Sequence, residues 1–363
     1  MTFVVDGLGL GGAEVHTLRL IKHLERSGVA VCLVVISQVR SPSITDDDLP
    51  RRTIWLNRGS MTTDLRGWLA AGQAIRSTNP RLVVGINEAA FSVCALAKLL
   101  RPYDAPLFCF LHTFEIATRS RRGIFKLLAK VAEGVVYVSA NQREHWQRQG
   151  THFRSDTVIL NGINLQSFTP QPARIRCNTR RNLGLSDDDY VVGLVGGFRP
   201  IKRHTLLVDA CAALRSEGIP IRLLMVGDGP TRPDVETRAR DLGIAQDVMI
   251  VGEQRIVQPY LAAMDVMALA SDSETMPLAA IEALACAVPV VLPDRGGATE
   301  IIDRGINGEL FTPGDLRDLT RILRALADPE RRRLLAARAR PSVIGKFDES
   351  RMMAEYAAFL GSG

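Results

Sequence analysis

The sequence lacks any apolar run that approaches the ~18 residues needed for a membrane-spanning helix. Its first residues, MTFVVDGLGLGG, have neither the basic start nor the small-residue cleavage site of a secretory signal. The six cysteines form no Cys-x-x-Cys pair, and most lie in apolar stretches such as VAVCLVV. We therefore expect buried thiols in a reducing compartment, which is typical of a cytoplasmic protein.

The composition is that of an ordinary globular protein. The chain has 363 residues, of which 46% are hydrophobic and 23% are charged, which excludes disorder and fibres. This length suits two domains or one large barrel.

The net charge of +6 conceals an asymmetry between the two halves. Residues 1–185 hold 24 Lys and Arg against 13 Asp and Glu, a net of +11, and residues 186–363 hold 21 against 26, a net of −5. A basic first half indicates an anionic partner. The alternative is a chance difference between two solvated surfaces.

Strands alternate with helices along the first half. TFVVD precedes a glycine-rich turn and an amphipathic helix from about Ala13 to Ser27, and VAVCLVVIS, RLVVGIN, PLFCFLH and GVVYVSA follow. Near-continuous apolar runs of this kind predict parallel strands buried on both faces, joined by right-handed helical crossovers.

The alternation fails from Asn161 to Leu185 and then restarts with YVVGLVG, IRLLMVG, DVMIVG, DVMALAS and VPVVLP. We predict an α/β protein with two Rossmann-like, doubly wound domains that face each other across a cleft. The expected boundaries are 1–165, a linker or domain edge at 166–190, a second domain at 191–340, and a terminal helix at 341–363 after a break near Pro341 and Gly345. Ligands bind such folds at the carboxyl ends of the strands.

Two glycine patterns overlap after the first strand. Gly7, Gly9 and Gly12 spell Gly-x-Gly-x-x-Gly, a dinucleotide fingerprint, but Arg40 rather than an acidic residue follows the second strand. This disfavours NAD and leaves an NADP-dependent oxidoreductase open. In the other interpretation, Gly11 and Gly12 open a helix whose N–H groups bind an anion. A third interpretation is a tight strand-to-helix turn that binds no ligand.

Basic residues follow the strand YVVGLV. The segment GGFRPIKRH, residues 196–204, places Arg199 and Lys202 after two glycines. A forked donor, a point charge and bare backbone are what a diphosphate leaving group requires. The alternative is a pair of solvated cations on a loop.

Two glutamates flank a helix start in SDSETMPLAAIEALACAVPVVLP. Glu274 precedes the helix, Pro277 fits its first turn and Glu282 lies within it. The helix rises about 10 Å from Thr275 to Glu282, a length that suits a nucleotide-sugar. Glu274 would bind sugar hydroxyls and Glu282 the ribose, unless both are surface residues beside a buried helix.

His112 ends the strand PLFCFLH, where its pKa range allows a neutral hydrogen-bonding role or a catalytic one.

Taken together, these motifs resemble the family-four glycosyltransferases of GT-B fold. The resemblance rests on GGAE, His112, NGI at 161–163, FRPIK, VGDGP at 226–230, the glutamate pair and GGATEII at 296–302. It covers nearly the whole chain and is strongest from about 191 to 315.

The resemblance implies a retaining, metal-independent transfer from a nucleotide diphosphate-sugar, expected to be a UDP-sugar, to a glycan or lipid-linked acceptor, with no cofactor. It implies catalytic roles for His112, Glu274, Arg199 and Lys202, and a last helix that crosses back to the first domain. The implied donor-binding set is Gly11, Gly12, Gly197, Arg199, Lys202, Gly252, Glu253, Arg255, Glu274, Thr275, Met276, Pro277 and Glu282.

The chain departs from the family pattern at Thr275 and Met276, where Gly-Phe is common, and at Ala287, where Gly is common. Three alternatives stay open: a nucleotide-sugar epimerase of the same fold, the NADP-dependent oxidoreductase, and a non-catalytic nucleotide-sugar-binding protein.

The segment TRSRRGIFKLLAKVAEG has helical periodicity. Ile124, Leu127, Leu128 and Val131 are expected to pack on the sheet, and Arg122, Lys126 and Lys130 to form a basic stripe that begins near Arg119 and Arg121. The stripe is either solvated or contacts anionic lipid headgroups or a lipid-linked diphosphate. We therefore predict acceptor or membrane contacts at Glu14, Arg119, Arg122, Lys126 and Lys130. We expect no nucleic acid partner and a cytoplasmic location, with the inner face of the cytoplasmic membrane as the alternative.

Overall fold

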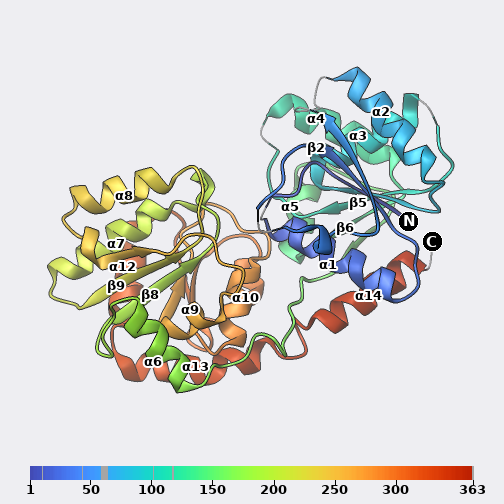
Figure 1. Cartoon of the computed structure of the whole chain (residues 1–363). Coiled ribbons are helices and arrows are strands. Elements are labelled where there is room, and N and C mark those ends of the chain that lie inside the picture. The colour runs from blue at the N-terminus through green and yellow to red at the C-terminus, as the bar shows by residue number, and fades with distance from the viewer. Residues whose placement is uncertain (10, 43, 59–63, 101, 117, 362–363) are drawn as a thin grey trace. The chain divides into compact units, whose positions relative to one another are not determined.

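A computed structural model describes residues 1–9, 11–42, 44–58, 64–100, 102–116 and 118–361. The chain divides into two compact units (Figure 1). The first comprises Met1–Asn161 with Met352–Gly363, and the second comprises Gly162–Arg351.

The first unit contains a parallel sheet in the order β3-β2-β1-β4-β5-β6-β7. Its strands are β1 (Thr2–Val5), β2 (Cys32–Ser37), β3 (Arg52–Arg58), β4 (Val83–Ile86), β5 (Leu107–Leu111), β6 (Gly134–Tyr137) and β7 (Asp156–Val158). Its helices are α1 (Gly12–Arg26), α2 (Leu65–Ser77), α3 (Asn87–Leu100), α4 (Arg119–Leu128), α5 (Ala140–Arg148) and α14 (Glu349–Gly361).

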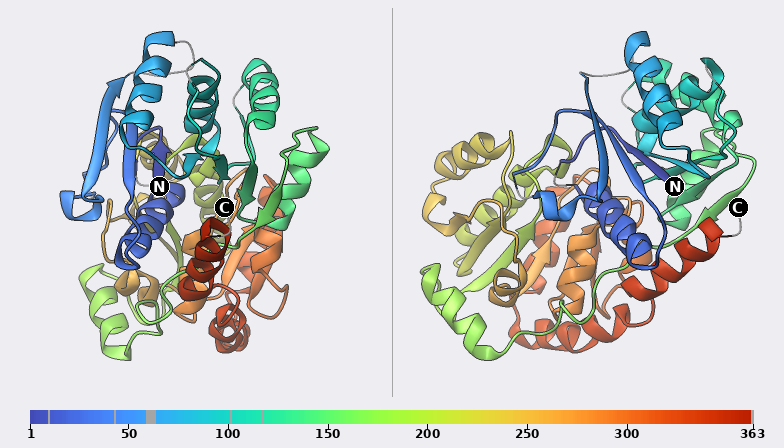
Figure 2. Two further views of the ribbon diagram at one scale, coloured as in Figure 1. Left: turned by 90° about the vertical axis from the view of Figure 1, so that its right-hand side faces the viewer. Right: turned by 45° about the vertical axis from the view of Figure 1, so that its right-hand side comes forward.

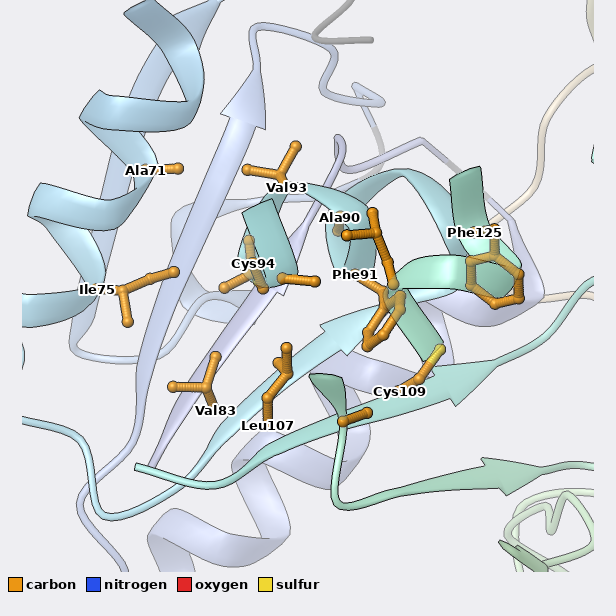
Figure 3. Close-up of a cluster of buried hydrophobic side chains, with 14 of the residues drawn as sticks. Ala71, Ile75, Val83, Ala90, Phe91, Val93, Cys94, Leu107, Cys109 and Phe125 are labelled. Atoms are coloured by element: carbon orange, nitrogen blue, oxygen red, sulfur yellow. The ribbon is translucent and has the colours of Figure 1, made fainter. Parts of the chain in front are cut away.

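Helices cover both faces of this sheet, so its central strands are continuously apolar. Val4 of β1 belongs to the same core cluster as Phe91 of α3 and Phe125 of α4. Figure 3 shows these two rings among their apolar neighbours. Phe3, the neighbour of Val4, points to the opposite cluster, which includes side chains of α1 and α14. This burial on both sides is why periodicity of two is absent from the sequence of these strands.

The second unit contains a parallel sheet in the order β10-β9-β8-β11-β12-β13. Its strands are β8 (Tyr190–Val195), β9 (Ile221–Val226), β10 (Val248–Ile250), β11 (Val266–Ala268), β12 (Val290–Pro293) and β13 (Gly308–Phe311). Its helices are α6 (Ala173–Asn182), α7 (His204–Ser216), α8 (Arg232–Asp241), α9 (Gln258–Ala263), α10 (Leu278–Ala285), α11 (Ala298–Ile301), α12 (Leu316–Ala325) and α13 (Pro329–Val343). Two parallel α/β sheets confirm the predicted fold class of two Rossmann-like domains.

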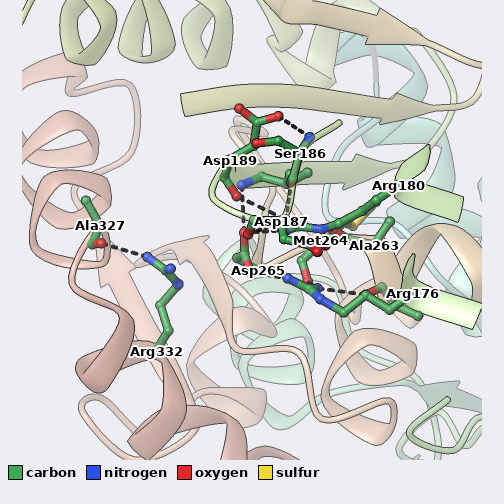
Figure 4. Close-up of polar contacts among 12 residues, drawn as sticks. Arg176, Arg180, Ser186, Asp187, Asp189, Ala263, Met264, Asp265, Ala327 and Arg332 are labelled. Carbon is green, nitrogen blue, oxygen red and sulfur yellow. Dashed lines mark hydrogen bonds and ion pairs between the residues drawn. The ribbon is translucent and has the colours of Figure 1, made fainter. Parts of the chain in front are cut away.

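The segment expected to be a linker contains helix α6, which is anchored in the second unit (Figure 4). The Arg180 guanidinium is 1% exposed and lies 2.7 Å from Asp265 Oδ2. It also donates to the carbonyls of Ser186, Asp187 and Asp189. Arg180, one of the arginines that made this stretch look like a polar linker, is therefore structural, because it pairs with Asp265 and satisfies three loop carbonyls.

The end of the chain returns to the first unit. Helix α13 continues through Pro341 to Val343, so the break falls at 344–348, around Gly345 with φ +78°, rather than at the proline. Pro341 lies inside the helix near its end, where its missing N–H removes one helical hydrogen bond. From Met352 onward the chain belongs to the first unit, where α14 lies beside α1 (Figure 2).

Candidate active site

In the second unit, the loops that follow β8, β9 and β10 are held together at the carboxyl edge of the sheet. Gly196 N–H donates to Val226 O at 2.9 Å, and Phe198 N–H donates to Asp228 O at 2.9 Å. Gly227 N–H donates to Gly252 O at 2.8 Å. The GGFRP, VGDGP and Gly252 segments are therefore neighbours, as the motif order required.

The glycines of these loops serve two purposes. A Cβ at Gly227 would collide with Gly196 O, and one at Gly229 would collide with Phe198 O, so close backbone packing requires both. By contrast, a Cβ at Gly196 would meet nothing within 4 Å, and one at Gly197 nothing nearer than 3.8 Å. Since packing does not require glycine at either position, the space beside this loop can admit a ligand.

Lys202 and Glu274 form an ion pair at this edge. Lys202 Nζ lies 2.6 Å from Glu274 Oε1, and the side chains are 25% and 8% exposed. The Ser271 hydroxyl donates to the same oxygen at 2.5 Å. The structure thus brings together two of the predicted catalytic residues and adds Ser271, which sequence reasoning missed although it lies in the same loop.

Arg199 is exposed on the same loop. Its backbone is extended, and it precedes the 3₁₀ turn Pro200–Lys202. Within the part of the chain that the structure describes, its guanidinium has no ion-pair partner, whereas Arg203 is paired with Asp272 at 3.0 Å. Arg199 is therefore a cation whose charge no neighbouring carboxylate offsets.

A buried ring pair anchors this basic loop. His204, the first residue of α7, stacks on Phe198 with ring centroids 4.2 Å apart and an interplanar angle of 11°. Burial, assisted by the Lys202 charge, lowers the pKa of His204 to about 4. The neutral imidazole can therefore pack as an aromatic ring beneath the loop that carries Arg199 and Lys202.

The helix after Glu274 begins later than expected. Pro277 is the N-cap of α10, so Thr275 and Met276 belong to the preceding loop rather than to the helix. The segment around Gly297 packs closely against this loop. Gly297 N–H donates to Glu274 O at 3.1 Å, and a Cβ at Gly297 would collide with Thr275 O. Glu282 lies within α10 and is half-buried.

Of the expected base-binding residues, Gly252 has φ +74° and lies against the VGDGP loop. Glu253 and Arg255 are exposed in the same segment.

In the first unit, His112 directly follows β5. Its backbone N–H donates to Asn87 Oδ1 at 2.7 Å, and Asn87 itself has a φ of +59°. Burial lowers the pKa of the His112 imidazole to about 4, so the side chain is neutral near pH 7. It is suited to exchange hydrogen bonds rather than to carry charge.

Gly11 and Gly12 open α1, as expected, but Glu14 covers the first of them. A Cβ at Gly11 would collide with the Glu14 carboxylate, which lies in the first turn of the helix. A carboxylate is stabilised at a helix N-terminus, where it takes the place that another anion would occupy. A phosphate that reaches Gly11 must therefore displace Glu14.

The prediction for α4 is wrong for two of its four apolar residues. Ile124 and Leu127 are 49% and 67% exposed, whereas Phe125 and Leu128 are buried. The Phe125 ring, whose centroid lies 5.5 Å from those of Phe91 and Trp146, sets the buried face.

The basic residues of this segment also differ in their surroundings. Arg121 turns inward to Glu88 at 2.5 Å, and Arg122 donates to Gln149 at 3.4 Å. Arg119 and Lys130 are exposed, and Lys126 is half-buried.

Two features are absent from the described ranges. No helix there is both long and apolar enough to cross a membrane. No three His, Cys, Asp or Glu side chains are grouped there in a way that could hold a metal ion.

Each half of the chain matches a glycosyltransferase family model. Residues 10–167 match "Glycosyltransferase Family 4", and residues 189–328 match "Glycosyl transferases group 1". The putative glycosyltransferase EpsF of Bacillus subtilis is 30% identical over 321 residues, 84% of this chain and 80% of EpsF. The chain also resembles HepE of Anabaena, solved in complex with UDP and glucose, with a TM-score of 0.87, 22% identity, and coverage of 100% and 99%.

These comparisons define an enzyme that transfers glycosyl groups. The chain belongs to the family-four glycosyltransferases of GT-B fold. The N-acetyl-alpha-D-glucosaminyl L-malate synthase of Bacillus anthracis is 32% identical over 178 residues, 49% of this chain and 46% of that relative. The chain thus spans less than half the length of that relative.

Proposed function

We propose that the chain transfers a sugar from a UDP-sugar to a glycan or lipid-linked acceptor, with retention of anomeric configuration and without a metal cofactor. The observation that carries the proposal is the edge of the second sheet, where the glycine-rich loop of Arg199 and Lys202 is joined to the loop of Glu274 by the Lys202–Glu274 ion pair. A Cβ at Gly197 of the first loop would meet nothing nearer than 3.8 Å, which leaves room for a ligand.

Arg199 and Lys202 would stabilise the leaving diphosphate. As the bond from the anomeric carbon to the diphosphate oxygen breaks, negative charge grows on the phosphate, and fixed cations lower the energy of that state. In the same-face pathway, the acceptor oxygen bonds to the anomeric carbon while its proton passes to the departing diphosphate oxygen.

Glu274 would orient the donor sugar. Among the described residues its side-chain partners, Lys202 and Ser271, both contact Oε1. This arrangement leaves Oε2 to accept hydrogen bonds from sugar hydroxyls. The carboxylate would thus hold the sugar and the diphosphate-binding lysine in one geometry, which lowers the entropic cost of reaching the transition state.

The remaining roles follow the family resemblance. Glu282 would bind the ribose, backbone of Thr275 and Met276 the phosphate, and Gly252 with its neighbours the base. His112 would act beside the reacting sugar as a neutral hydrogen-bonding group, in keeping with its lowered pKa. UDP is our first choice of nucleotide because the structurally similar HepE was solved with it.

Thermal melting with UDP, GDP, ADP, dTDP and NADP tests the donor. A ligand at 100 times its dissociation constant stabilises by about 2.7 kcal/mol, and we expect that shift with UDP alone. Stabilisation by NADP instead would contradict the proposal. UDP release that depends on an acceptor and persists in EDTA would support metal-free transfer, whereas release without any acceptor would favour the epimerase.

We further propose that α4 docks the enzyme on an anionic membrane that carries the acceptor. No acidic residue occurs between Arg119 and Val131, where five are basic. Ile124 and Leu127 are exposed on the same short helix. Each basic residue near an anionic surface contributes about 1 kcal/mol, and burying a Leu or Ile side chain contributes about 1.5–3 kcal/mol.

Liposome co-sedimentation tests this docking. The wild type should bind anionic and not neutral vesicles, and binding should weaken as salt rises. Charge reversal at Arg122, Lys126 and Lys130 should abolish it, and so should Ile124→Asp with Leu127→Asp. Leu334→Asp on α13, which is 54% exposed, is the matched control and should bind as the wild type does. Equal sedimentation of all variants would leave α4 a solvated helix and favour a soluble acceptor.

A further inference from the structure

Four aromatic rings from three separate parts of the chain meet behind His112. The His16 ring of α1 lies 4.9 Å from the His112 ring, centroid to centroid, at a 58° angle. The Tyr356 ring of α14 lies 5.2 Å from His16 on another side. Tyr356 in turn lies 5.1 Å from Phe110, which is two residues before His112 on β5.

His16 is held by these ring contacts. The residue is 3% exposed, and its Nε2 atom has no hydrogen-bond partner among the residues that the structure describes. Tyr356 is fully buried, so its ring cannot move without opening the core of the first unit. Tilted aromatic pairs at such separations are favourable and directional.

We propose that His16 and Tyr356 fix the orientation of the His112 imidazole, so that His16 is a positioning residue for glycosyl transfer. The proposal rests on the proposed role of His112 in that reaction. It also gives α14 a role in positioning, because Tyr356 of α14 contacts the His16 ring.

The two sides of His112 are then fixed by different means. Asn87 accepts the His112 backbone N–H, which sets where the residue leaves the strand. His16 contacts the ring, which sets how the imidazole points. A catalytic group misplaced by about 1 Å can cost up to 100-fold in rate, so a ring free to rotate would be a poor hydrogen-bonding partner.

The cluster also favours uncharged imidazoles. Burial lowers the pKa of both histidines, and each would repel a proton on the other. A neutral imidazole has one nitrogen that donates and one that accepts, so the orientation of the ring decides which of them faces a ligand.

Nitrogen-15 NMR of labelled histidine tests the positioning without any substrate. In the wild type, we expect His112 to give one tautomer, with distinct protonated and unprotonated nitrogens. His16→Leu and Tyr356→Leu should give averaged nitrogen shifts, whereas His16→Phe and Tyr356→Phe, which keep the rings, should not. Unchanged His112 signals in both leucine variants, or equal changes in Leu and Phe variants, would overturn the proposal.

Kinetics supply the second readout. His16→Leu should lower kcat roughly tenfold or more and leave the donor KM within twofold, and His16→Phe should restore kcat. His112→Ala separates the two proposals. If it keeps wild-type turnover, the role of His112 fails while the NMR result stands. If His112→Ala is inactive and His16→Leu is not impaired, the positioning proposal alone fails. Should His16→Leu not fold, the Tyr356 pair gives the same comparison.

Discussion

The predicted functional residues of the two units differ in chemistry at corresponding edges of their sheets. At the carboxyl edge of the second sheet they lie among ion pairs, with Lys202 paired to Glu274 and Arg203 to Asp272. After β5 in the first sheet, the predicted functional residue is His112, a half-buried neutral imidazole that contacts the buried imidazole of His16.

The difference shows how each edge restricts its ligand. Fixed cations bind a group that carries or develops negative charge, because their favourable interaction grows during the reaction. Buried neutral rings cannot do so, but they define the direction of hydrogen bonds. On the proposed function, Arg199 and Lys202 would bind the leaving diphosphate, and His112 would bind the sugar hydroxyls.

Among the substitutions that test this comparison, removal of the Lys202 side chain should have the largest effect on stability and turnover. Lys202→Met leaves the Glu274 carboxylate buried without its cation, and breaking a buried pair costs about 3–5 kcal/mol. Because Lys202 is 25% exposed, we expect the lower end of that range. Turnover should fall about 100–1,000-fold, as when one transition-state donor is removed. Urea unfolding and donor turnover measure the two effects.

The double variant Lys202→Met with Glu274→Gln separates stability from catalysis. It removes both charges, so most of the lost unfolding free energy should return while turnover stays low. Recovery of turnover in this variant would contradict a direct role of Lys202 on the diphosphate.

Substitution of Arg199 should lower turnover and leave the unfolding free energy almost unchanged. Its guanidinium is exposed, and no ion pair of the described chain depends on it. Arg199→Ala should reduce turnover about 100–1,000-fold with the unfolding free energy changed by about 0.5 kcal/mol or less. Arg199→Lys keeps the charge but loses the forked donor, so it should recover activity only in part. The exposed Arg181 of α6, changed to Ala, is the control; near-normal activity of Arg199→Ala at saturating donor would exclude the residue from the diphosphate.

The second unit was the more predictable because its motifs are local. Arg199 and Lys202 lie in one nine-residue segment with their glycines, and the parallel strands bring that segment to the same edge as Glu274. The contact of His16, His112 and Tyr356 could not be predicted, since these residues lie on distant segments that no spacing rule connects.

Other errors also have physical causes. The α4 segment has two overlapping apolar faces, and periodicity alone could not show that Phe125, rather than Ile124 and Leu127, is buried. Strands β3, β7 and β13 were not predicted from their sequences, RTIWLNR, DTV and GELF. They form edges of their sheets, where polar residues in a strand are tolerated.

Acid should affect the first unit more than the second. Burial lowers the pKa of His16 and His112 in the first unit and of His204 in the second. Below pH 6.5 the unfolded chain binds protons that these folded groups do not, so the unfolding free energy falls as the pH drops toward 4. One pKa unit corresponds to about 1.4 kcal/mol, which gives roughly 3 kcal/mol for each of His112 and His204.

Urea unfolding between pH 7 and pH 4.5 measures this loss. His204→Phe keeps the stack on Phe198 and should reduce the acid sensitivity of the second unit only. Gln in place of the exposed His152 is the control and should have little effect. Equal acid sensitivity in wild type and His204→Phe would show that His204 is not buried as a neutral ring.

The smallest predicted effect concerns Ala287, the departure from the family's glycine. Ala287 has a φ of +61° immediately after α10. Ala287 N–H donates to Leu284 O, and Val288 N–H donates to Ala283 O, both at 2.9 Å. This is the Schellman ending, in which glycine is preferred because a Cβ is strained in the left-handed region. Ala287→Gly should therefore raise the unfolding free energy by about 1 kcal/mol.

Ala285→Gly on the same helix is the matched control for Ala287. Its backbone is helical, so glycine there should lower the unfolding free energy by about 1 kcal/mol, the opposite sign. Urea unfolding of the two variants at pH 7 compares them directly, and destabilisation by both would mean that Ala287 is not strained. Because Glu282 lies on α10, equal donor affinity in wild type and Ala287→Gly would further show that the alanine sets the stability of this helix end rather than the position of the ribose-binding carboxylate.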